Sequence, residues 1–210
     1  ETDPVGGNLG VAKLSAAALF DLTSSFGGDG FKDADNNDIE DADAIAYEVD
    51  LLVANGANSN LTDTLSGDVV TLHQVSATLI EGRVGATVVF SLSIDANTGE
   101  TTLTQNRAVV HNDPNDPDQS GSPAVLGNDL VGVKVTVTDG DLDHVSQTAN
   151  LNNVIKFEDD GPKAFDPEDT IVQNKAGATI IGDLDITTHT GSDGLGSIVF
   201  GPGTDGQASA

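Results

Sequence analysis

The sequence lacks cysteine, methionine and tryptophan, and its 210 residues include one tyrosine and eight basic residues. Without cysteine there is no disulfide framework, and a large secreted protein of this kind would need another source of stability, of which bound metal is the usual one. No apolar run approaches the 18 residues of a membrane-spanning helix, so we expect no direct membrane insertion. The scarcity of tryptophan and tyrosine leaves few rings on which a sugar could stack.

Positive charge is also scarce. The chain has 34 acidic residues and a net charge of −26. Nucleic acid is excluded as a partner, because its binding depends on lysine and arginine at phosphates, and anionic membrane surfaces are excluded for the same reason. Such a charge can indicate disorder, but several segments alternate cleanly between apolar and polar residues. An acidic fold that needs cations to offset self-repulsion agrees with both observations.

Alternation with a period of two predicts short β-strands. It is clearest in residues 131–138, where Val131, Val133, Val135 and Val137 alternate with smaller or polar residues. Other strands are expected at 47–53, 69–72, 75–80, 88–94, 101–104, 108–110 and 154–157. We expect a polar loop at 55–63, a turn at Glu81-Gly82, and a helix or a strand at 14–22, where alanine favours the helix.

Seven or more short strands without a long helix predict an all-β fold. The best match is a calcium-stabilised Greek-key β-sandwich of immunoglobulin-like or cadherin-like type. Six residues are expected in its core: Phe20, Tyr47, Phe90, Val135, Val137 and Phe157. Residues 1–162 are expected to form one sandwich, and residues 163–210 the opening strands of a second, truncated or split module, because so few strands cannot bury a core alone.

Three acidic segments are candidate metal sites. In the first, Asp139, Asp141 and Asp143 lie two residues apart, so their carboxylates can share one side of an extended chain. In the second, residues 33–43, the candidate ligands are Asp33, Asp35, Asn37 and Asp41. The third is Asp159 and Asp160, before Gly161-Pro162. Calcium takes six to eight oxygen ligands, which carboxylates and loop carbonyls supply.

The alternative for each segment is a solvated turn, since aspartate and glycine are ordinary turn residues. Residues 33–43 do not fit an EF-hand, because Asp38 stands at the usual glycine and Ala44 at the last ligand position. Zinc spacing and nucleophile or nucleotide motifs are missing too, and the four histidines are scattered. We therefore expect no enzyme.

The runs VTVTDGDLDHV and IKFEDDGP resemble the C-terminal signature of repeat modules in RTX bacterial adhesins, and VVFSLSIDANTGETTLTQNRAVVHND resembles an upstream part. Leu142 stands where that family usually has glycine. The resemblance implies tandem repeat modules, type I secretion and an extracellular place on the bacterial cell surface. It also implies a role in cell adhesion and biofilm, with Ca²⁺ as cofactor.

We therefore expect a calcium-dependent structural extender or spacer in a secreted adhesin. Its partners would be neighbouring modules of the same adhesin, with an inserted ligand-binding domain as a further candidate. The alternative is a ligand-binding adhesin module for peptide or glycan. An exposed aromatic cluster would favour that alternative, and the sequence shows none.

Overall fold

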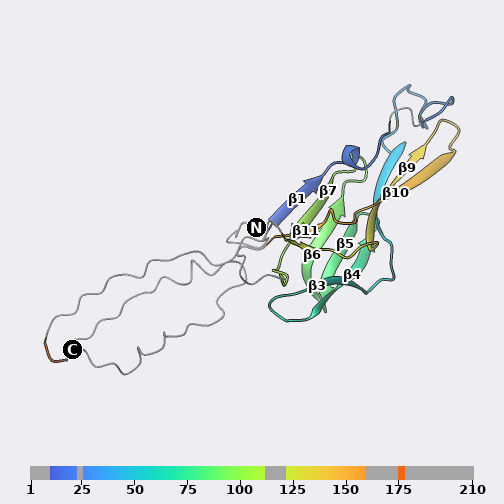
Figure 1. Ribbon diagram of the computed structural model, residues 1–210. Coiled ribbons are helices and arrows are strands. Elements are labelled where there is room, and N and C mark those ends of the chain that lie inside the picture. The colour runs from blue at the N-terminus through green and yellow to red at the C-terminus, as the bar shows by residue number, and fades with distance from the viewer. Residues whose placement is uncertain (1–9, 23–25, 112–121, 159–174, 178–210) are drawn as a thin grey trace.

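The computed structural model describes residues 10–22, 26–111, 122–158 and 175–177, and within these ranges it contains strands and no α-helix (Figure 1). The strands are β1 (Gly10–Leu14), β2 (Ile45–Leu51), β3 (Ala57–Thr62), β4 (Val69–Ser76), β5 (Leu79–Val84), β6 (Thr87–Ile94), β7 (Thr101–Gln105), β8 (Ala124–Val125), β9 (Val131–Thr138), β10 (His144–Asn150) and β11 (Lys156–Phe157). The single 3-10 turn in this part of the chain is η1 (Ala16–Ala18). No helix among these residues could span a membrane. The predicted all-β class is confirmed.

The strands form antiparallel sheets that pack as a sandwich. The larger sheet has the order β1-β7-β6-β5-β4-β3, and a second has the order β10-β9-β2, with β11 and β8 paired beside them. Strand β1 lies next to β7, the last of five consecutive antiparallel strands, so β1 with β5, β6 and β7 forms a Greek-key arrangement. Strand β2 contacts β4, β5 and β6 across the sandwich, so the two layers share one core.

The core is apolar and aromatic. All six core residues expected from the sequence are buried, and the rings of Phe90 and Phe157 meet with centroids 5.2 Å apart. The four alternating valines of β9 are each at most 5% exposed, as their period predicts. Strands β6 and β7 lie where strands are predicted at 88–94 and 101–104, and Gly99 in the turn between them has a φ of +67°.

Several local predictions were wrong. Residues 57–62 form strand β3 instead of a polar loop, because Ser59 and Leu61 are buried while Asn58 and Asn60 are exposed, the alternation of a strand. Glu81-Gly82 lies inside β5 instead of in a turn, because the Phe90 ring occupies the space where a side chain at Gly82 would be. The chain turns earlier, between Ser76 and Leu79.

A bulge explains one error in β6. Gly82 pairs with Phe90 whereas Arg83 pairs with Val88, so Val89 is an extra residue between the two pairs. The alternation shifts there, so Val89 is fully buried although strict alternation from Phe90 would place Val88 inward.

Two further differences concern strand type. The strand expected at 154–157 is reduced to β11, and Val154 is 46% exposed. The strand that follows β9 and pairs with one of its edges is β10, a polar strand that apolar alternation does not reveal. Alanine-rich 14–22 forms the end of β1 and η1, and residues 108–110 contribute an isolated bridge between Asp63 and Val109.

The second module expected at 163–210 lies outside the described residues apart from 175–177. The division into 1–162 and 163–210 stays a prediction.

Candidate metal centres

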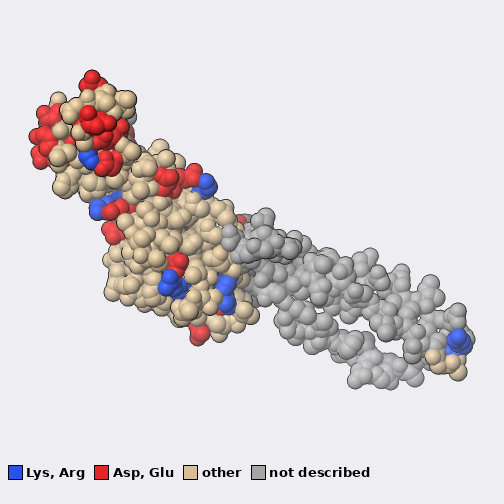
Figure 2. Space-filling view, turned by 180° about the vertical axis from the view of Figure 1, so that it is seen from behind, with Lys and Arg blue, Asp and Glu red and all other residues tan. Residues whose placement is uncertain are grey.

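Acidic side chains gather at one end of the sandwich, over the 26–43 segment and the β9–β10 hairpin (Figure 2). Residues 26–43 contain seven acids and residues 139–143 contain three, against one basic residue, Lys32. Lys32 is already engaged, since its Nζ lies 2.5 Å from a carboxylate oxygen of Asp43. Most of the negative charge at this end therefore has no cationic side chain to balance it.

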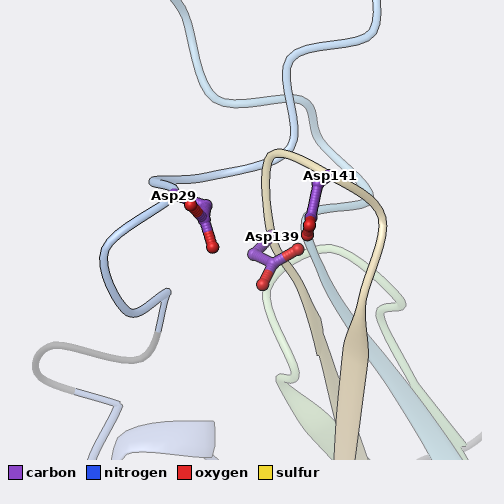
Figure 3. A group of neighbouring side chains, drawn as sticks. All are labelled: Asp29, Asp139 and Asp141. Atoms are coloured by element: carbon purple, nitrogen blue, oxygen red, sulfur yellow. The ribbon is translucent and has the colours of Figure 1, made fainter.

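The first cluster joins two segments far apart in the sequence. Asp29, Asp139 and Asp141 each offer a carboxylate oxygen, and these oxygens lie within 4.8 Å of one another. Figure 3 shows Asp29 and Asp141 on either side of Asp139, with their carboxylates directed into the space between the two loops. We call these three residues the two-loop cluster.

Backbone contacts hold the two loops in this position. The Gly140 N–H donates to the carbonyl of Gly30 at 3.1 Å, and Phe31 forms a β-bridge with Asp139. An added Cβ at Gly140 would lie 2.5 Å from the Asp29 carbonyl oxygen, so only glycine permits this approach. The position of Asp29 beside Asp139 thus depends on the backbone and on Gly140.

The hairpin loop itself is closed by Asp139. Its Oδ1 accepts the Asp143 N–H at 3.0 Å, and its own N–H donates to the Asp143 carbonyl. Leu142 has a φ of +73°, a left-handed conformation that favours glycine. The loop thus adopts a conformation suited to glycine although leucine occupies position 142.

The surroundings of Asp139 within the two-loop cluster oppose its ionisation. A hydrogen bond with the Asp141 carboxyl, desolvation and the negative charge of Asp141 together raise the pKa of Asp139 above its ordinary value. A raised carboxyl pKa means that the surroundings oppose ionisation. A divalent cation between these oxygens would reverse that effect.

The second cluster lies within the 33–43 loop. Carboxylate oxygens of Asp33, Asp35 and Asp41 lie within 4.8 Å of one another. Asp41 accepts the Ala34 N–H at 3.0 Å, which closes the loop across its base. Asn37 lies beside these carboxylates, since its Nδ2 donates to Asp35 at 2.9 Å and its Oδ1 accepts the Ile39 N–H at 2.7 Å.

Asp33 is the most strongly organised residue of this second cluster. Desolvation opposes its ionisation, but N–H groups of Asn37 and Asp38 donate to its two carboxylate oxygens, and the net effect lowers its pKa. Asp33 is therefore ionised over a wide pH range, as a cation ligand must be.

The structure brings some of the predicted site residues together and not others. It brings Asp139 and Asp141 together, and likewise Asp33, Asp35 and Asp41, whereas Asp143 is in neither carboxylate group. Asn37 lies beside the second group, where its Nδ2 donates to Asp35 at 2.9 Å. Asp159 and Asp160 lie outside the described residues. Sequence reasoning missed Asp29. Its only signal was the Asp29-Gly30 pair, which matches Asp139-Gly140 and lies in a glycine-rich turn.

Both clusters offer hard oxygen ligands without histidine or cysteine, which suits calcium or magnesium and not zinc. A cation at the two-loop cluster would connect the 26–31 segment to the β9–β10 hairpin. A cation at the second would stiffen one loop only.

A family model described as a domain of unknown function, DUF5801, matches residues 2–152. No curated protein and no solved structure matches the chain. Since the match covers more than half of the 210 residues, the chain belongs to the DUF5801 family.

Proposed function

We propose that this chain is a calcium-dependent structural module of a secreted bacterial surface adhesin, acting as a spacer between neighbouring modules. The observation that carries the proposal is the two-loop cluster, where Asp29 meets Asp139 and Asp141 across a separation of about a hundred residues. Its carboxylates would hold the ion, and loop carbonyls or water would supply further oxygens.

Calcium suits these clusters better than magnesium does. Calcium accepts variable coordination by carboxylates and carbonyls, whereas magnesium requires a near-ideal octahedron and loses its water reluctantly. The two clusters lie on loops at the end of the sandwich. Calcium tolerates the irregular ligand geometry that such loops provide.

A spacer needs stiffness, and metal supplies it here in place of disulfides. With no cysteine and ten acids in two adjoining loops, this end of the molecule is held together against repulsion by a few backbone bonds. An ion bound there would oppose separation of the loops and stabilise the fold by mass action. The resemblance to RTX adhesin modules supports the further steps of secretion by type I export, a cell-surface location and contact with neighbouring modules.

Calorimetric calcium titration tests the metal part of the proposal. The parent should bind calcium with saturation, and Asp29→Asn should weaken binding although this residue lies outside the β9–β10 hairpin. Asp68→Asn is the matched control, because Asp68 is an exposed aspartate outside both clusters. Equal calcium affinity in the parent and Asp29→Asn would contradict a two-loop site.

Small-angle scattering on a tandem of two complete chains tests the spacer part. Calcium should increase the maximum dimension and chelator should reduce it, because a stiffened loop end limits bending between modules. If the maximum dimension is equal in both conditions while calcium still binds, the chain is a metal-binding module but not a calcium-stiffened spacer.

A further inference from the structure

The bend between β2 and β3 contains the only Asn-Gly pair in the sequence, Asn55-Gly56. Because glycine has no side chain, its amide nitrogen can approach the preceding side chain closely. That nitrogen can bond to the Asn55 Cγ while ammonia leaves, which gives a cyclic succinimide. Water then opens either carbonyl of the ring to yield aspartate or isoaspartate, so the net reaction consumes one water and releases one ammonia.

Steric shielding does not protect this pair. Asn55 and Gly56 are both exposed, and no heavy atom would lie within 4 Å of a Cβ at Gly56. Solvent and base can therefore reach the reacting atoms.

Two hydrogen bonds restrain the groups that would react, and these bonds protect the pair where steric shielding does not. The Gly56 N–H, whose nitrogen would be the nucleophile, donates to the Leu72 carbonyl at 2.7 Å. The Asn55 Oδ1, on the carbon to be attacked, accepts the Gln74 N–H at 2.9 Å. Both partners belong to β4, and the bonds continue the β3–β4 ladder beyond its Ala57–Leu72 pair.

We propose that Asn55-Gly56 is a deamidation site that β4 holds unreactive until this end of the β3–β4 ladder opens. The nitrogen must lose its proton and the side chain must rotate, and each step requires release from β4. Local opening of a ladder end costs less free energy than global unfolding, so the site would react in a protein that is otherwise folded.

The Gln74 side chain holds this end of the ladder closed. Its Oε1 accepts the Leu51 N–H at 2.8 Å, and its Nε2 donates to the Val49 carbonyl at 2.9 Å. These bonds attach the end of β2, and with it the start of the bend, to β4. Loss of this side chain should loosen the bend without changing Asn55 or Gly56.

Deamidation would have a structural consequence. An aspartate retains an oxygen for the Gln74 N–H, but it adds negative charge to a chain already at −26. An isoaspartate adds an atom to the backbone before β3, so the bonds to Leu72 and Gln74 could not both re-form. The modified bend would stay open.

Peptide mapping by mass spectrometry tests this proposal on the full chain at mildly alkaline pH. Deamidation of Asn55 should be slower by roughly tenfold or more in the folded parent than in urea. In Gln74→Ala, checked for folding by circular dichroism, the native rate should rise by about fivefold while the rate in urea stays unchanged. Asn97-Thr98 is the internal control, being exposed but without glycine.

Two results would overturn the proposal. One is an equal rate at Asn55 in the folded and the urea-unfolded parent, which would mean that β4 gives no protection. The other is the absence of product in urea, which would mean that the pair is unreactive. Either is decided on the parent alone, so a variant that failed to fold would not affect the conclusion.

Discussion

At the residue scale, Asp139 combines two opposing roles. Its carboxylate closes the hairpin loop by accepting the Asp143 N–H, but the neighbouring Asp141 carboxyl raises its pKa. A folded carboxyl with a raised pKa contributes stability below its ordinary pKa, and this contribution is lost as pH rises through the raised value. At neutral pH the ionised Asp139 therefore opposes folding unless a cation is present.

The effect of Asp139→Asn on the melting temperature should therefore have opposite signs in chelator and in calcium. Asparagine retains Oδ1 for the Asp143 N–H and removes the charge, so in chelator the variant should melt at a higher temperature than the parent. In calcium it should melt at a lower one, because a ligand is missing. Thermal melts under both conditions measure this, and a variant that melts below the parent in chelator would show that crowding is not the dominant effect.

Leu142 carries backbone strain in the same loop. Its φ is +73° and its side chain is 61% exposed, so leucine gains little packing there. Leu142→Gly should raise the free energy of unfolding by about 0.5–1 kcal/mol, because glycine adopts this conformation without a Cβ clash. Urea titration measures the change. Leu65→Gly is the control, because Leu65 is 80% exposed and is not among the residues with positive φ, so that variant should gain nothing.

Part of the candidate site could be predicted from the sequence, because it depends on residues that lie close together along the chain. The spacing of Asp139 and Asp141, or of Asp33 and Asp35, places carboxylates close together by short-range geometry alone. Asp29 could not be found in this way, because its position depends on the Gly30–Gly140 contact between distant segments. Asn37 stays a predicted ligand, and its amide bonds to the Ile39 N–H and to Asp35 within the same loop.

At the scale of elements, the β5–β6 pair shows why strand positions were misassigned. Gly82 was read as a turn residue, but it lies within β5 under the Phe90 ring. A glycine in a strand often marks close approach of another group, and here that group is a core side chain. The valines of β9 were predictable because no bulge interrupts their alternation, whereas the polar strands β3 and β10 follow from pairing with neighbours that sequence does not reveal.

Gly82→Ala should therefore destabilise the sandwich. The added Cβ would lie 2.1 Å from a ring carbon of Phe90, so the ring must move within a packed core. We expect a loss of about 1–3 kcal/mol in urea unfolding, the usual cost of overpacking. Gly10→Ala is the control, because a Cβ there meets no atom within 4 Å, and equal stability of the two variants would contradict the packing assignment.

A buried ion pair fastens the turn after β3. Asp63 is fully buried, and Arg107 reaches its two oxygens from Nε and a terminal nitrogen at 2.8 and 2.7 Å. Desolvation opposes ionisation of Asp63, but hydrogen bonds from Ser66 and Arg107 prevail and lower its pKa. Stability from this pair is complete above the ordinary carboxyl pKa near 4 and is lost as pH falls through the lowered value.

Arg107→Ala should cost about 3–5 kcal/mol at neutral pH, since it leaves a buried carboxylate without its partner. The difference from the parent should shrink on acidification, when Asp63 can bind a proton. Urea titrations at neutral and acidic pH measure both. Lys13→Ala is the control, because the Lys13–Glu100 pair is exposed and should contribute less than about 1 kcal/mol. A pH-independent deficit in Arg107→Ala would exclude the charge as its cause.

At the scale of the whole molecule, the charge is large, and it is unevenly placed over the described residues. The net charge is −26, and among the described residues acidic side chains gather at the end formed by the 26–43 segment and the β9–β10 hairpin (Figure 2). Self-repulsion at that end should destabilise the compact chain in the absence of divalent metal. Two kinds of cation can relieve it: monovalent salt by diffuse screening, and calcium by direct contact with carboxylate oxygens.

These two effects can be separated by melting the chain in chelator, in chelator with added sodium chloride, and in millimolar calcium at the same ionic strength. Sodium chloride should raise the melting temperature gradually, because screening at about 0.1 M acts over roughly 10 Å. Calcium should raise it further at concentrations too low to screen, since a bound ion stabilises by about 2.7 kcal/mol at a hundredfold excess over its Kd. Magnesium should do less than calcium. If sodium chloride at equal ionic strength reproduced the whole effect of calcium, the acidic end would be a screened surface and not a binding site.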